Sequence, residues 1–205
     1  MSQSIQQIAP GVVHWSAPHP AHGFEVSSYL LTETGVVFDP ITPPDGIEWF
    51  AENGVEPREI LLSCRLHRRN TKDLVARYGC GVHAVRAGMH QFGPEDAVRP
   101  FDFGDTLAGD VQALLVDAIS PDETAFFVPD VRALVVADGV VNYDGLSFVP
   151  DNLMGDDPET VKRGLTAAFA RIADEVDFDH LLCAHGDPVV GNGRIQLREF
   201  VAGMA

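Results

Sequence analysis

The chain has 205 residues, of which 45% are hydrophobic and 21% are charged, and its formal net charge is −16. A chain of this length can bury a full apolar core without disulfide bonds, and its composition argues against intrinsic disorder. The strong negative charge repels polyanions, which excludes nucleic acids and anionic membranes as favoured partners. We therefore expect a globular protein whose partner is a small-molecule ligand or substrate.

The cysteines and the start of the chain indicate the compartment. The three cysteines, Cys64, Cys80 and Cys183, are an odd number at scattered spacing, which is not a disulfide framework. Residues 1–8 lack the basic and apolar regions of a secretory signal. No stretch approaches the roughly 18 uninterrupted apolar residues of a membrane span. We expect a reduced, cytoplasmic protein.

The first half of the chain predicts mostly strands. β-Branched and aromatic residues, with Pro and Gly in the turns, predict strands over residues 11–15, 26–32, 36–38, 59–63 and 82–85, and a loop over 16–23. Apolar residues at helical spacing predict helices over residues 45–53 and 70–78, with Gly54 and Gly79 ending them.

The second half predicts further strands and two more helices. The strands cover residues 112–116, 125–128, 133–136 and 181–184. A long helix is expected over about residues 158–176, with Asp156 or Asp157 as its N-cap, and a last helix over 196–204. No linker or repeat interrupts the chain, so we expect one α/β domain over residues 1–205, built from sheets with helices on their outer faces.

Three of the predicted strands are followed by loops that carry charged or potentially catalytic side chains. The first loop, residues 63–70 with the sequence SCRLHRRN, concentrates positive charge in an acidic chain and precedes a helix N-terminus, a combination that favours anions. The alternative is that its arginines pair with the protein's own carboxylates on a solvated face. Asp138 follows the second strand and His185 follows the third. Alone, Asp138-Gly139 is an ordinary turn sequence and His185 an ordinary structural histidine.

Together these segments resemble the metallo-β-lactamase superfamily, which includes the glyoxalase II-like hydrolases. The resemblance runs from Ile8 to about Phe200, through the segments IAPGVVHW, VSSYLLT, GVVFDP, FDFGDTL, ALVVADGVV and LLCAHGDPV. It implies a four-layer αβ/βα sandwich of two similar halves with a metal site between the sheet edges. It also implies that Asp39 stands where the family usually has an aspartate, that Asp138 is the bridging aspartate, and that His185 is the last metal ligand.

The main family signature, H-x-H-x-D-H, is degenerate in this chain. Aligned on Ser63, its four ligand positions hold Cys64, Leu66, Arg68 and Arg69, and a later family histidine falls at Ile119. Leucine and isoleucine cannot ligate a metal, and arginine is cationic with no lone pair to donate. We therefore expect no resident cofactor, and we expect Arg68 or Arg69 to replace the missing cation and to pair with Asp138.

Two other uses of these residues stay open. A single divalent ion (zinc, iron or manganese) could be held by His67, Asp138 and His185, with Glu123 or Cys64 as a further ligand. Cys64 could instead be a nucleophile activated by nearby positive charge and His67. The remaining early histidines, at positions 14, 19 and 22, are expected to be surface or loop residues.

The sequence leaves three classes of function. The first is a hydrolase-like protein of altered or lost activity, with catalytic Asp138, His185 and His67, acting on an ester, thioester, lactone or phosphoester. The second is a metal-free pseudoenzyme that binds a small anion in a cleft of Arg68, Arg69, Asp138 and His185, with Cys64 also in contact. The third is a structural or regulatory partner protein with a large apolar interface. The fold does not decide among them.

Overall fold

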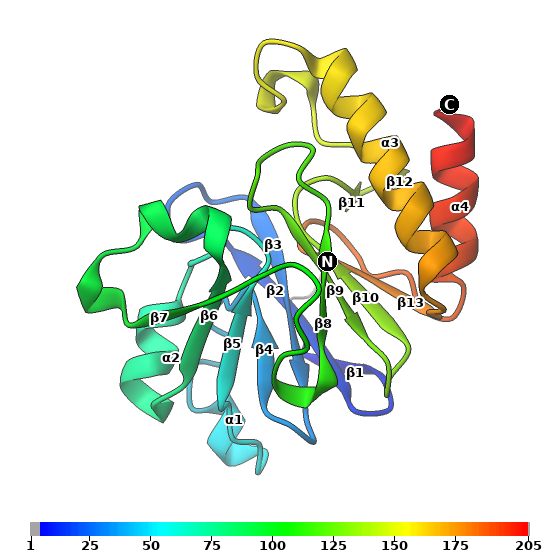
Figure 1. Ribbon diagram of the computed structural model, residues 1–205. Helices are drawn as coiled ribbons and strands as arrows, with labels where there is room; N and C mark the ends of the chain where they lie inside the picture. Colours follow the sequence, from blue (N-terminus) through cyan, green and yellow to red (C-terminus); the bar gives the residue numbers. More distant parts are fainter. Residues whose placement is uncertain (1–4, 205) are drawn as a thin grey trace. The chain divides into compact units, whose positions relative to one another are not determined.

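The computed structural model describes residues 5–204, which form two compact units that divide between Asp102 and Phe103 (Figure 1). The expectation of one domain over residues 1–205 stays a prediction. Part of the N-terminal stretch in which no secretory signal is predicted, residues 1–4, lies outside the described residues. Within residues 5–204, the helices are too short or too polar to cross a membrane.

The first unit is built on a seven-stranded sheet in which every strand lies beside its neighbour in sequence. The strands β1 to β4 are antiparallel and β4 to β7 are parallel. Their bounds are β1 Gln6–Ala9, β2 Val12–Pro18, β3 Glu25–Leu31, β4 Val36–Phe38, β5 Glu59–Leu62, β6 Gly81–Val85 and β7 Val98–Phe101. The carboxyl ends of β4 and β5 therefore meet at the same edge of the sheet.

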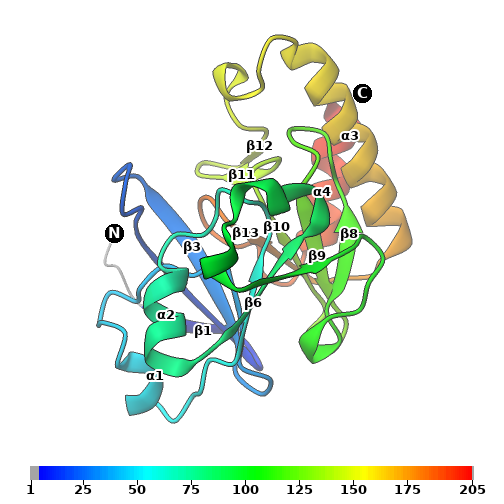
Figure 2. The same cartoon turned by 60° about the vertical axis from the view of Figure 1, so that its left-hand side comes forward.

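Two helices, α1 (Trp49–Glu52) and α2 (Thr71–Tyr78), pack on one face of this sheet (Figure 2). Phe50 of α1 and Leu74 of α2 are buried in a single apolar cluster with strand residues that include Ile60 and Leu62. Helix α2 ends at Gly79, whose φ of 72° lies in the left-handed region that favours glycine. Two short 3₁₀ helices, Arg86–Gln91 and Pro94–Asp96, connect β6 to β7.

The first unit departs from the sequence predictions in several places, and β2 extends to Pro18, into the loop predicted over residues 16–23. The helix predicted over residues 45–53 is helical only from Trp49 to Glu52, because Gly46 adopts a φ of 92° that ends the preceding turn. Strand β7 was not predicted, since Pro100 interrupts its pattern, as proline does in edge strands. His14 is a buried residue of β2, stacked on Tyr29 and hydrogen-bonded to Ser27, and not a loop residue.

The second unit is built on a four-stranded sheet in the order β13-β10-β9-β8. Strands β8 (Gln112–Leu115), β9 (Thr124–Val128) and β10 (Ala133–Val136) are antiparallel, and β13 (His180–Cys183) is parallel to β10. A separate hairpin pairs β11 (Val141–Asn142) with β12 (Leu146–Ser147). Two further 3₁₀ helices cover Ala108–Asp110 and Asp151–Leu153.

Helices α3 (Pro158–Glu175) and α4 (Gly193–Gly203) pack side by side, and their apolar faces cover the second sheet (Figure 1). Asp157 is the N-cap of α3 and accepts a hydrogen bond from Thr160 N, as predicted for one of the two candidate caps. Leu165 and Phe169 of α3 pack in one cluster with Val136 of β10 and Cys183 of β13. The long helix therefore holds the two strands that carry Asp138 and His185.

Because α3 buries Leu165 completely, Leu165→Ala is expected to lower the free energy of unfolding by about 2–5 kcal/mol. The matched control is Leu153→Ala, because Leu153 is 61% exposed and exposed positions usually change stability by no more than about 0.5 kcal/mol. Urea denaturation followed by circular dichroism measures both. Equal losses in the two variants would contradict the packing described for α3.

Candidate functional site

In the first unit, the ends of two neighbouring parallel strands bring Asp39 and Ser63 together. Asp39 follows β4 and Ser63 follows β5. The backbone N–H of Ser63 donates a hydrogen bond to Asp39 Oδ1 at 2.8 Å, and its hydroxyl donates to Oδ2 at 2.5 Å. Asp39 is 1% exposed, and a buried carboxylate needs such partners because its desolvation is costly.

The third partner of Asp39 is His67, from the loop between β5 and α2. His67 Nδ1 lies 2.9 Å from Asp39 Oδ2 and 2.9 Å from Ser63 Oγ. A carboxylate only accepts hydrogen bonds, so we assign a proton to Nδ1 of His67. His67 is buried, as is Cys64 on the same loop. The histidine is thus held in one orientation from one side of its ring.

The electrostatics of this cluster keep Asp39 ionised. Burial on its own would raise the pKa of Asp39, but its electrostatic interactions with His67 and Arg69 and the hydrogen bonds from His67 and Ser63 outweigh this effect. The pKa of Asp39 is therefore lowered from its ordinary value of 3.8. Asp39 and its partners form a buried charged network at neutral pH.

Arg69 completes the network through the backbone. Its Nη1 donates hydrogen bonds to Ser27 O at 2.6 Å and to Asp39 O at 2.8 Å. The guanidinium thus joins β3 to the end of β4 and adds positive charge near the Asp39 carboxylate. Arg69 itself has a φ of 37°, in the left-handed region. The prediction that it pairs with Asp138 stays a prediction.

Arg68, the neighbouring arginine, lies on the surface of the first unit. Its Nη1 lies 3.3 Å from Gln91 O and 3.5 Å from Asp96 Oδ2, and the guanidinium stands over the Phe92 ring at 5.2 Å. The side chain is 45% exposed. These contacts match the alternative in which the arginines pair with the protein's own carboxylates. A contact of Arg68 with Asp138 stays a prediction.

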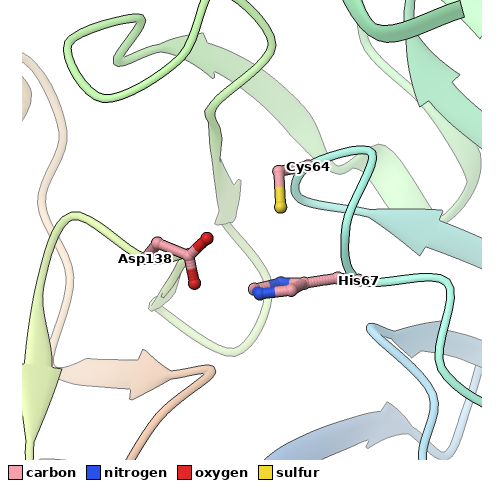
Figure 3. Close-up of side chains that lie close together, drawn as sticks. All are labelled: Cys64, His67 and Asp138. Carbon is pink, nitrogen blue, oxygen red and sulfur yellow. The ribbon is translucent and has the colours of Figure 1, made fainter. Parts of the chain in front are cut away.

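Cys64 and His67 are the residues of this loop that can ligate a metal or react as a nucleophile and a base. A ring nitrogen of His67 lies within 4.8 Å of the Cys64 sulfur. Figure 3 shows the thiol and the imidazole, both carried by this loop. Leu66 points away from the interior and is 64% exposed. The loop therefore presents Cys64 and His67 inward and Leu66 and Arg68 outward.

In the second unit, the parallel pairing of β10 with β13 brings Asp138 and His185 together. Val136 is opposite Cys183 in this pairing, and Asp138 and His185 each lie two residues further on. His185 Nε2 is 2.8 Å from Asp138 Oδ1. Asp138 (labelled in Figure 3) is half-buried and His185 is buried. Two of the three strand ends singled out from the sequence therefore lie side by side in this unit.

Glu123 holds the turn that carries Asp138. The Glu123 carboxylate is buried and accepts hydrogen bonds from Gly139 N at 2.6 Å and Ile119 N at 3.4 Å. A Cβ on Gly139 would lie 2.6 Å from Glu123 Oε1 and 2.7 Å from Leu165 Cδ2. Gly139 is therefore needed for close packing. The sequence analysis named Glu123 only as a possible ligand and missed this positioning role.

Sequence reasoning also missed the partners of Asp39. It assigned the aspartate to a family position but no contact, and it used Ser63 only to set the alignment. The signal was present in part, because Asp39 and Ser63 each directly follow a predicted strand. The sequence did not show that these two strands are adjacent and parallel.

The donor set does not fit the two-metal site that the resemblance implies. At the position that takes three histidines, Leu66 has no donor atom and is exposed, and Ile119 packs against the apolar core of the second unit. At the other position, the Arg68 and Arg69 guanidinium groups are hydrogen-bonded within the first unit. His67 does have the arrangement typical of a ligating histidine, with one ring nitrogen on a carboxylate.

Comparison with known proteins identifies the fold. No family model matches the chain, and no curated protein matches it in sequence. Several solved structures are similar to it in fold. The di-iron-bound form of TTHA1623 is 23% identical, with 86% of this chain and 95% of that chain covered and a TM-score of 0.66. A metallo-β-lactamase from Pontibacter korlensis is 13% identical, with 97% and 98% covered and a TM-score of 0.69.

A third similar structure is the flavodiiron core of Flv1 from Synechocystis sp. PCC6803, at 12% identity and a TM-score of 0.68. It covers 98% of this chain, and the match spans 60% of that longer chain. The chain thus has the α/β metallo-β-lactamase fold, which confirms the fold class predicted from the sequence. At these sequence identities the similarity defines the fold only, and the chemistry has to be argued from the residues of the site.

The Asp39 network predicts both a stability loss and a pH dependence. Asp39→Asn removes the charge that His67 and Arg69 face, so the free energy of unfolding at pH 7 is expected to fall by on the order of 3 kcal/mol. Because the pKa of Asp39 is lower in the folded chain, its contribution is present above the unfolded pKa of about 3.9 and is lost as pH falls through the folded pKa. Urea denaturation between pH 7 and pH 3 measures both effects.

The control for this experiment is Asp102→Asn, because Asp102 forms an exposed ion pair with Arg86. Exposed pairs contribute little, so this variant should unfold as the wild type does at pH 7. An Asp39→Asn variant as stable as the wild type would mean that the network does not hold the loop.

Gly139→Ala is expected to lower the free energy of unfolding by about 1–3 kcal/mol, because the added methyl group overpacks the site against Glu123 and Leu165. Gly203→Ala is the matched control, since a Cβ there meets no atom within 4 Å and alanine favours the helix. Thermal unfolding of both variants tests this. A neutral Gly139→Ala would show that Glu123 is free to move.

Proposed function

We propose that this chain is a cytoplasmic, hydrolase-like protein of the metallo-β-lactamase fold in which most of the family's metal ligands are replaced, so that its activity on a small-molecule substrate is altered. The observation that supports this most strongly is the hydrogen-bonded cluster of Asp39, Ser63 and His67. It holds a buried imidazole in a fixed orientation in the loop where the resemblance places metal ligands. A fixed imidazole is the usual group for proton transfer in hydrolysis.

The second unit supports the same proposal independently. Asp138 and His185 form a carboxylate–imidazole pair at 2.8 Å, at the carboxyl ends of two parallel strands. Such strand ends are where open α/β sheets carry their sites. The resemblance implies that sites in this family take residues from both halves of the chain. We therefore assign the proposed catalytic set to His67, Asp138 and His185.

The proposed substrate is an ester or thioester small enough to reach a buried imidazole. With its net charge of −16 the chain does not attract polyanions. The residues favour an activity that does not need the family's two ions. A single divalent ion on His67, Asp138 and His185 is the other form that the same set could take, and it would supply an activated water.

A metal-free anion-binding protein is the second candidate. The observation that favours it is the exposed Arg68 guanidinium, whose partners are one carbonyl oxygen, one carboxylate and an aromatic face. Part of its donor set therefore faces solvent. In this form of the site Arg68 and Arg69, beside Asp138, His185 and Cys64, would bind a small carboxylate or phosphate. Such a ligand would raise the melting temperature without being turned over.

The proposal is tested with the full chain purified without added metal. Elemental analysis is expected to find fewer than two equivalents of zinc, iron and manganese together. Release of nitrophenol from a nitrophenyl ester, or of thiol from an acyl thioester, should fall at least 100-fold in His185→Ala, since acid–base groups typically contribute 10²–10⁴-fold. His180→Ala is the control, because His180 begins the same strand at its other end.

Two outcomes contradict the proposal. Full occupancy by two ions would show that the family's metal chemistry persists on other ligands. No hydrolysis, together with an upward shift of melting temperature in a carboxylate or in inorganic phosphate that is lost in Arg68→Ala, would favour the anion-binding candidate instead.

A further inference from the structure

Three side chains of the first unit have the arrangement of a nucleophile, a base and a residue that orients the base. The Cys64 sulfur lies within 4.8 Å of a ring nitrogen of His67, and His67 Nδ1 lies 2.9 Å from Asp39 Oδ2. Both contacts lie within one compact unit. This order of thiol, imidazole and carboxylate is the general pattern of an activated nucleophile.

The orientation of His67 determines which nitrogen serves the thiol. In a triad arranged in this way Nε2 is the ring atom that takes the thiol proton, because Nδ1 is bonded to Asp39 and Ser63. Ser63 also fixes the carboxylate, since its N–H and hydroxyl bind the two oxygens of Asp39. The imidazole can therefore neither rotate nor change its tautomer without breaking this network. An orienting carboxylate has this role in catalytic triads.

The other two thiols of the chain lie in different surroundings. Cys80 Sγ lies 3.5 Å from Pro57 O and 3.8 Å from Leu74 O, and burial raises the pKa of its thiol to about 11. Cys183 is fully buried in β13, and burial raises the pKa of its thiol to about 12. Both are unreactive structural thiols at neutral pH. Cys64 differs from both because it lies next to an oriented imidazole, so Cys80 and Cys183 serve as reference thiols within the same chain.

We propose that Cys64 is the nucleophile of the proposed hydrolase, with His67 as its general base and Asp39 as the positioning residue, and that it accepts the acyl group of small esters and thioesters. This inference rests on the proposed function and deepens it. The cluster is built from a loop and two strand ends of one unit. Cys64 and His67 are each 4% exposed, so the proposed acyl group is a short one.

The reaction balances without a cofactor. Cys64 Sγ attacks the carbonyl carbon of the ester while the thiol proton passes to His67 Nε2, and a carbon–sulfur bond forms. The carbon–oxygen bond to the alcohol breaks, and the alkoxide leaves with the proton from His67. Water then attacks the thioester on Cys64 and gives up a proton to His67, which returns it to the sulfur as the acid is released. No electron is gained or lost.

The first test measures thiol reactivity in the folded protein, with a chelator present so that bound metal does not contribute. The chain is treated with iodoacetamide at pH 7, and peptide mass spectrometry gives a rate for each cysteine. Cys64 is expected to react at least tenfold faster than Cys80 and Cys183. His67→Ala should lower the Cys64 rate at least tenfold, and Asp39→Asn should lower it several-fold. Circular dichroism confirms that each variant is folded.

The second test follows the acyl group. With p-nitrophenyl acetate, one equivalent of p-nitrophenol per chain should appear in a burst, and the acetyl group should be found on Cys64. Cys64→Ala should abolish the burst, and Cys80→Ala, the matched control, should keep it. A Cys64 rate equal to that of the buried thiols, or a burst that survives in Cys64→Ala, overturns the inference.

These outcomes separate the inference from the function on which it rests. If Cys64→Ala hydrolyses esters at the wild-type rate, Cys64 is not the nucleophile, while the hydrolase itself stands. If the wild type hydrolyses no ester or thioester, both fail. If His67→Ala leaves the Cys64 alkylation rate unchanged, the pairing of base and thiol fails whatever the hydrolase activity is.

Discussion

The buried carboxylate of Asp39 is the interaction on which the first unit's site depends. It binds Ser63 through both oxygens and His67 through one, and its own carbonyl oxygen accepts from Arg69. The hydroxyl of Ser28 also donates to that carbonyl, at 2.5 Å. A single residue thereby ties the middle of β3 and the ends of β4 and β5 to the loop that precedes α2. Asp39 adopts a φ of 46°, and Arg69 a φ of 37°, conformations that persist only where the surroundings fix them.

The Asp39 network explains how the loop between β5 and α2 is held in place. In a metal site, too, a carboxylate or carbonyl on the second ring nitrogen orients a ligating histidine. In this loop, hydrogen bonds to Asp39 fix His67, and the arginines at two of the aligned ligand positions make contacts within their own unit. Arg69 adds positive charge near the carboxylate of Asp39. The loop can therefore be well ordered by protein groups alone, which makes a changed chemistry compatible with a stable fold.

The sequence predicted what depends on local pattern. β4 and β10 have the predicted bounds, because each is a short apolar run between clear turn residues. The meeting of Asp138 and His185 followed from placing each at the end of a buried strand. Predictions failed where a distant contact decides. His14 is buried because it packs on Tyr29 and bonds to Ser27 of the neighbouring strand β3, and the short helix α1 yields to the turn at Gly46.

The sequence predicted which residues of the loop are reactive or charged, but not most of the contacts that they make. The pairing of Cys64 with His67 was considered from the sequence, because the two residues are close in the chain. The partners of His67 and Arg69 outside their own loop were not predicted, since those contacts join residues that lie far apart in the chain. Asp39 binds a histidine 28 positions further on, and Glu123 binds a glycine 16 positions away. Charge alone suggested that the two arginines act alike, whereas Arg69 reaches two carbonyl groups and Arg68 lies on the surface.

The pairing of β10 with β13 has a consequence for how the chain can vary. Asp138 and His185 meet because Val136 lies opposite Cys183, so their contact is set by strand register and not by the length of chain that joins them. Insertions at the exposed turn between β11 and β12, residues 143–145, lengthen a surface loop, at an entropic cost that grows slowly with length. A single residue inserted within β13 would turn every following side chain to the opposite face of the sheet. Homologous chains that share this pair are thus expected to vary in length at that turn while keeping β13 free of gaps.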